Sequence, residues 1–300
     1  MILTRKKKKR LALFNQGVEA IHRIAPEAPR GYVCPNCLKL FQSRDSSDRF
    51  LSLDHVPPRR LGGRLEILTC TQCNSRAGHL LEAKMKAMED VLDFFRGTME
   101  ESRTVRFVVG RYSLKAEVRS ENSVIRVHGL PRNNKPSDQQ AVIDEFNRLA
   151  DSGGHPTDSR LRIVFLGGGL SFKQVQIGWL RAGYLAVFAV LGYGYVLQPP
   201  LALVRKQLDE PTNMIIPKFY AHCGRANRNE RRIVIVNEPA EFRSIAVQMG
   251  RHIVFLPAPG DSTFYNRLAT ESSRNVQFEG RELEWPKQPN FRVDFASPMP

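Results

Sequence analysis

Two Cys-x-x-Cys pairs limit what this chain of 300 residues can fold into more than any other feature of its sequence. Cys34 and Cys37 form the first pair, and Cys70 and Cys73 form the second. Each pair places two thiols close together on a tight loop, and the 32 residues between the pairs allow them to meet. Four thiolates complete the tetrahedral shell of Zn²⁺ and leave no open position. The pattern therefore predicts a structural zinc site that stabilises the fold.

Charge and cysteine use indicate the partner and the compartment. The formal net charge of +15 favours a polyanionic partner, and nucleic acid is the first candidate. Four of the five cysteines lie in the two pairs and only Cys223 is left over, which argues against disulfides and for a reducing compartment. The basic run at residues 5–10 is not followed by an apolar stretch of signal-peptide length. We therefore expect a protein that binds nucleic acid and is cytoplasmic, or nuclear if the source has a nucleus.

Residues 177–197 are almost wholly apolar and approach the length of a membrane span. Arg181 lies within this stretch, and a charge near the middle of a bilayer is costly. The sequence therefore favours a pair of buried helices in a soluble core, with no membrane partner.

The chain divides by pattern into three ranges. Residues 1–30 read as a basic tail with a short helix at 11–24, and residues 31–103 as a cysteine and histidine module that ends in a helix from about 74 to 96. Residues 104–300 read as a larger mixed α/β domain of unknown role. Its expected strands are 105–109, 114–118, 124–127, 162–166, 233–236 and 253–256, and its expected helices are 136–150 and 172–191. This order of elements predicts an α+β fold with a mixed or antiparallel sheet.

Three polar residues lie between or beside the cysteine pairs. Asp54 and His55 follow an apparent strand at 50–53, and Asn74 directly follows Cys73. The oxygens of Asp54 and Asn74 are of the kind that Mg²⁺ or Mn²⁺ prefers. His55 has the side chain whose ordinary pKa suits a general base near neutral pH. The set points to the hydrolysis of phosphodiester bonds, and with the basic composition it predicts a nuclease.

Further polar residues surround this set. His79 lies five residues after Asn74, about 140° away around a helix, so it is either an additional ligand or phosphate contact, or a residue of the helix surface. Four arginines are expected to contact backbone phosphates without reading sequence, namely Arg59, Arg60, Arg64 and Arg76.

The order Cys-x-x-Cys, Asp-His-x-x-Pro, Gly-Gly, apolar strand, Cys-x-x-Cys-Asn, helix resembles the HNH endonuclease family in its zinc-stabilised ββα-metal form, over about residues 31–97. The resemblance implies an N-terminal module in which a β-hairpin and a helix hold one catalytic Mg²⁺ or Mn²⁺. It assigns Asp54 and Asn74 as metal ligands and His55 as the general base. The family usually has a further Asn, which pins the active-site loop, nine residues before the last one, and here that position is Leu65.

The sequence is also compatible with three other functions. A catalytically inactive zinc module that only binds nucleic acid is one, and Leu65 favours it. A second is an interaction protein whose C-terminal domain acts on its own. The third is a nuclease in genome defence, whose C-terminal domain senses a ligand or foreign DNA and controls cleavage.

Overall fold

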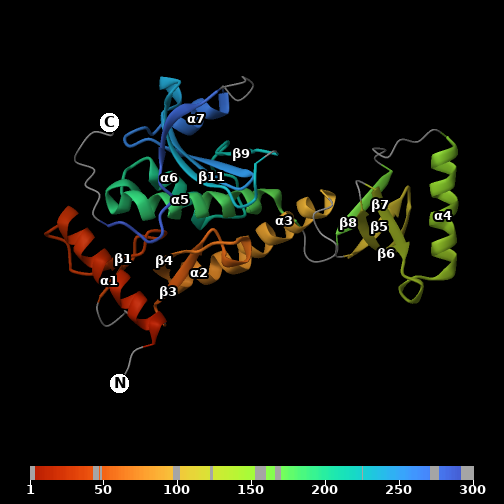
Figure 1. Ribbon diagram of the computed structural model, residues 1–300, viewed down its shortest axis with the longest axis horizontal. Helices are drawn as coiled ribbons and strands as arrows, with labels where there is room; N and C mark the ends of the chain where they lie inside the picture. Colours follow the sequence, from red (N-terminus) through yellow and green to blue (C-terminus); the bar gives the residue numbers. More distant parts are fainter. Residues whose placement is uncertain are drawn as a thin grey trace. The chain divides into compact units, whose positions relative to one another are not determined.

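The chain forms two compact units in a computed structural model that describes residues 4–42, 47, 49–96, 102–121, 124–152, 160–165, 170–224, 226–270 and 277–291 (Figure 1). The first unit joins Met1–Lys86 to Ser171–Pro300, and the second is Ala87–Leu170. Residues after 170 thus pack with the cysteine pairs, whereas the sequence placed a boundary between residues 103 and 104. The fold is α+β, as the order of elements predicted.

The first part of unit one contains two short hairpins and the helices that flank them. Its strands are β1 (Tyr32–Val33), β2 (Leu40–Phe41), β3 (Leu51–Val56) and β4 (Leu65–Cys70). Its helical segments are α1 (Arg5–Ile24), η2 (Arg59–Leu61), α2 (Thr71–Ala77), the π-helical turn η3 (Gly78–Glu82) and α3 (Ala83–Phe95), which runs on into unit two. The strands pair antiparallel, β1 with β2 and β3 with β4.

The second part of unit one is a helical segment followed by a sheet. Its helices are α5 (Phe172–Val196), α6 (Leu201–Asp209), η5 (Ala240–Phe242) and α7 (Phe264–Thr270). Its strands are β9 (Tyr220–His222), β10 (Arg231–Glu238), β11 (Ser244–Met249), β12 (His252–Pro257) and β13 (Glu279–Leu283). They form one antiparallel sheet in the order β13-β10-β11-β12-β9.

Helix α5 is the central element of unit one. It contacts β11 and β12 of the five-stranded sheet as well as β3 and β4 of the hairpin, and Figure 1 shows it running along that sheet. The helix is long and apolar enough to cross a membrane, yet 89% of its most apolar window is buried inside the protein. A helix that is apolar on all sides requires such surroundings. The segment is kinked at Gly192, where φ is 65°, so that a long helical stretch is followed by a short one.

Close packing of α5 on the sheet depends on Gly183. A Cβ atom at this position would lie 2.2 Å from Cγ2 of Val254 in β12. We expect Gly183→Ala to lower the free energy of unfolding by about 1–3 kcal/mol, because an overpacked core must shift. Gly78→Ala is the matched control, since nothing lies within 4 Å of its Cβ position and alanine favours the helix. Chemical denaturation measures both, and equal stability of the two variants would contradict this packing.

The N-terminal helix begins earlier than the sequence indicated. Helix α1 starts at Arg5, where the side chain of Thr4 accepts a hydrogen bond from the Lys7 N–H at 3.4 Å. The basic run therefore forms the first turns of a helix and is not a tail. Lys9 pairs with Glu66 of β4, and Arg10 is buried.

Unit two is an antiparallel sheet with one helix packed on it. Its strands, β5 (Arg103–Val109), β6 (Tyr112–Glu121), β7 (Val124–Gly129) and β8 (Leu161–Phe165), follow the order β7-β6-β5-β8. Its helical segments are η4 (Pro131–Asn133) and α4 (Pro136–Asp151). The core consists of apolar residues from the sheet and α4 together with Phe94. The alternating apolar residues of the sequence correctly predicted β5 and β6.

Candidate functional site

The four paired cysteines meet at one point in unit one. Cys34 and Cys37 lie on the connection between β1 and β2, whereas Cys70 ends β4 and Cys73 lies in the first turn of α2. Their four sulfur atoms all lie within 4.8 Å of one another, and Sγ of Cys37 is 3.7 Å from Sγ of Cys70. This arrangement can hold a metal ion, and the thiolate donor set fits structural zinc.

Backbone groups and mutual contacts orient the four thiols. The Cys70 N–H donates to Sγ of Cys34 at 3.3 Å, and the Cys73 N–H donates to Sγ of Cys70 at 3.4 Å. Hydrogen bonding to Cys34 is the main cause that lowers the pKa of Cys37 and also brings the pKa of Cys70 to about 7. Contacts with the other thiols raise the pKa values of Cys34 and Cys73. Negative charges on four sulfurs this close repel one another, and a bound cation compensates that repulsion.

Asp54 is buried in β3 beside an arginine from α5. Its side chain forms an ion pair with Arg181, and Oγ1 of Thr69 donates to its Oδ2 at 3.3 Å. Asp54 is 2% exposed and Arg181 is 6% exposed. Nη1 of Arg181 also lies 3.9 Å from Oε1 of Glu82. The guanidinium thus joins two carboxylates from β3 and η3.

The electrostatics of this group follow from burial and from the ion pairs. Burial alone would lower the pKa of Arg181, but Asp54 and Glu82 raise it above its ordinary value. Burial raises the pKa of Glu82, and the nearby charge of Asp54 adds to this effect, whereas Arg181 and Arg60 oppose it. Arg181 therefore compensates the charge of both carboxylates, and Arg60 adds to its effect on Glu82.

Removal of Arg181 should destabilise the protein strongly. We expect Arg181→Met to lower the free energy of unfolding by about 3–5 kcal/mol, because it leaves the charge of Asp54 buried and unpaired. The double variant with Asp54→Leu should recover much of that loss. Arg76→Met, which breaks an exposed pair with Asp209, is the control and should cost at most about 1 kcal/mol. Urea denaturation of the four proteins checks this, and equal effects of the two arginine variants would contradict a compensating role for Arg181.

His55 directly follows Asp54 in β3, and it lines a small hollow together with Glu82 and Arg181. His55 stands directly opposite Glu66 in the β3–β4 pair, and its Nε2 lies 3.3 Å from Oε1 of Glu66. Its side chain is 28% exposed. Glu66 also binds Lys9. The structure therefore holds the imidazole through a carboxylate that the sequence did not single out.

Asn74 lies in α2 and reaches back to β3. Its Nδ2 donates to Oγ of Ser52 at 2.9 Å, and Ser52 lies on the same face of β3 as Asp54. Asn74 and Asp54 therefore approach the same side of the hairpin. His79 is exposed in η3 and makes no hydrogen bond or ion pair with the described residues.

The four predicted phosphate-binding arginines are all exposed, but their surroundings differ. Arg59, Arg60 and Arg64 lie on and just after η2, beside the hairpin. The positive charge of Arg60 lowers the pKa of Glu82. Arg76 donates a hydrogen bond to Asp209 of α6 at 2.6 Å. Arg59 and Arg64 thus remain the side chains most open to an added phosphate.

Sequence reasoning missed the partners of the predicted residues. In the sequence Arg181 stands out only as a charge in an apolar stretch, which is a usable signal because buried charges need partners. Glu66 carries a signal too, since it is the only charged residue of β4. Nothing in the sequence points to Glu82.

The donor chemistry of Asp54 and Asn74 fits a hard divalent ion, because both offer oxygens on the same side of β3. An ion at Asp54 would compete with Arg181 for the carboxylate. Comparisons of the chain with protein-family models, curated proteins and solved structures found no match.

Proposed function

We propose that this protein is a metal-dependent endonuclease of the HNH type that hydrolyses phosphodiester bonds of DNA. The observation that carries the proposal is the arrangement of the β3–β4 hairpin and α2 next to the four-cysteine cluster. This arrangement presents Asp54 and Asn74 on one side of β3. The net charge of +15 supports a polyanionic substrate.

In the proposed reaction His55 is the general base that takes a proton from the attacking water. Glu66, whose Oε1 lies 3.3 Å from Nε2 of His55, holds the imidazole in position. Asp54 and Asn74 would hold Mg²⁺ or Mn²⁺, which when bound supplies charge stabilisation at the phosphate and the leaving 3′ oxygen. Arg59 and Arg64 position the DNA backbone without reading its sequence.

Incubation with supercoiled plasmid tests the proposal. We expect nicking or linearisation with Mg²⁺ or Mn²⁺, and none when these ions are chelated. Zinc content must be measured in the same samples, so that loss of the structural ion is not mistaken for loss of the catalytic one. If the plasmid stays intact after incubation of zinc-loaded protein with Mg²⁺ and also with Mn²⁺, the proposed nuclease activity is refuted.

A second function, nucleic-acid binding without cleavage, is favoured by two observations. The Asp54 carboxylate is already compensated by Arg181. Leu65, at the position where the HNH family usually has an Asn, is a core residue with 2% exposure. Under this alternative the zinc module would serve only as a scaffold for basic side chains.

The salt dependence of DNA binding tests the surface that both functions share. We expect Arg59→Gln with Arg64→Gln to make the slope of log K against log salt shallower, by about 0.9 for each duplex phosphate that the variant no longer neutralises. A double change of two exposed lysines distant in sequence, Lys173→Gln and Lys287→Gln, is the charge-matched control. Equal slopes for the two double variants would remove these arginines from the interface.

A further inference from the structure

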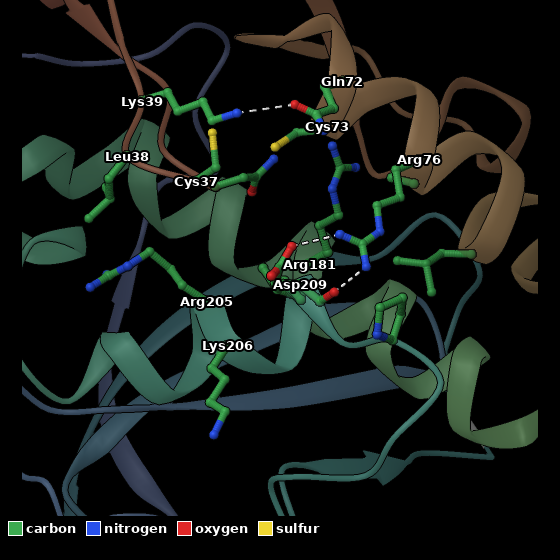
Figure 2. A pocket seen from close by; sticks show the side chains of 15 residues that line it. Cys37, Leu38, Lys39, Gln72, Cys73, Arg76, Arg181, Arg205, Lys206 and Asp209 are labelled. Atoms are coloured by element: carbon green, nitrogen blue, oxygen red, sulfur yellow. Dashed lines mark hydrogen bonds and ion pairs between the residues drawn. The ribbon is translucent and has the colours of Figure 1, made fainter.

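A basic cavity of about 490 Å³ lies beside the four-cysteine cluster in unit one (Figure 2). Its walls come from segments far apart in the sequence: the β1–β2 connection, α2, α5 and α6. Cys37 and Cys73 lie on its wall, but Asp54 and His55 do not. The cavity therefore adjoins the proposed hydrolytic residues through Arg181, the partner of Asp54, but those residues do not line it.

The lining of this cavity is strongly cationic. The lining contains one acidic residue, Asp209, and five basic residues, which are Lys39, Arg76, Arg181, Arg205 and Lys206. The three arginines of the lining already have partners. Arg76 binds Asp209, Arg181 binds Asp54, and Arg205 donates to the Val196 carbonyl. Lys39 makes a 3.3 Å hydrogen bond to Gln72, and Lys206 is exposed without a hydrogen bond or ion pair to any described residue. Figure 2 shows these two lysines on opposite sides of the hollow.

Asn36 adds a second, independent observation. It lines the same cavity, is only 8% exposed, and neither its Nδ2 nor its Oδ1 has a hydrogen-bond partner within the described part of the chain. An unpaired buried amide is unfavourable, so such a group indicates a bound partner. The amide needs a ligand that offers an acceptor and a donor side by side.

We propose that this cavity binds a nucleoside phosphate, with the Asn36 amide paired to the edge of the base and Lys206 in contact with the phosphate. The edges of nucleobases offer adjacent donors and acceptors, which asparagine can pair with. A simple anion would leave Oδ1 of Asn36 unpaired, and an apolar ligand would leave Lys206 unmatched. The volume lies within the usual range of ligand sites. The nucleotide can be free or part of an unpaired strand.

Binding titrations with full-length, zinc-loaded protein test this site. Calorimetry with AMP and with ribose 5-phosphate separates the base from the phosphate. We expect AMP to bind about tenfold more tightly, because only AMP can pair with the amide. Asn36→Leu should bring AMP down to the affinity of ribose 5-phosphate and leave ribose 5-phosphate unchanged. Equal affinity of the two ligands for the wild-type protein would overturn the proposal.

Zinc content and melting temperature show whether Asn36→Leu folds. If it does not, lysine variants still test the proposal. Lys206→Gln should weaken both ligands about tenfold, whereas the exposed control Lys173→Gln should leave both unchanged. Equal effects of these two variants would also overturn the proposal. If a short single-stranded oligonucleotide competes with AMP, the site binds a nucleotide of an unpaired strand. If it does not compete, the site binds free nucleotides. No Mg²⁺ or Mn²⁺ is added, so the result does not depend on whether the protein cleaves DNA.

Discussion

Replacement of Cys70 by serine is expected to remove the zinc and most of the folded protein. Cys70 ends β4, caps α2 through the Cys73 N–H, and contributes one of four sulfurs within 4.8 Å of one another. Structural zinc contributes about 10–16 kcal/mol in zinc-finger peptides, which is comparable to the whole stability of a domain. Elemental analysis should find about one zinc ion per chain in the wild type and almost none in Cys70→Ser.

Cys223→Ser is the control for this prediction, because Cys223 lies outside the cluster. It should keep its zinc and its circular dichroism spectrum. Soluble, folded wild-type protein that contains no zinc would show that the four cysteines do not form a structural site.

Replacement of His55 by alanine is expected to lower the rate of plasmid cleavage by about 10²- to 10⁴-fold, the usual contribution of a positioned general base. Folding should be almost unaffected, since the imidazole lies at the surface of the hairpin and its ion pair with Glu66 is partly exposed. Single-turnover rates with saturating enzyme measure the chemical step apart from DNA binding.

His22→Ala supplies the matched control, because His22 is an exposed histidine of α1. It should cleave at the wild-type rate. Cleavage by His55→Ala as fast as by the control would show that His55 is not the base. Loss of DNA binding in His55→Ala would indicate a phosphate contact in place of proton transfer.

Local patterns in the sequence predicted much of the fold. The alternation in residues 105–109 and 114–118 became β5 and β6, and the apolar stretch after Phe172 became α5. The meeting of the two cysteine pairs was predicted as well, because metal-ligand spacing is itself a long-range constraint. The π-helical turn at Gly78–Glu82 was missed, since the apolar spacing there suited a continuous α-helix.

The sequence by itself determined many of the helices and strands, the α+β class and the four-cysteine cluster, because each depends on residue spacing along one or two short segments. Only the tertiary structure decided that Arg181 would pair with Asp54, and that Asn36 would face a cavity shared with α6. These contacts join residues more than 100 positions apart, and they depend on the face that α5 turns toward the hairpin. A buried helix that is apolar on all sides carries no pattern to specify that face, so packing against β12 and the hairpin had to select it.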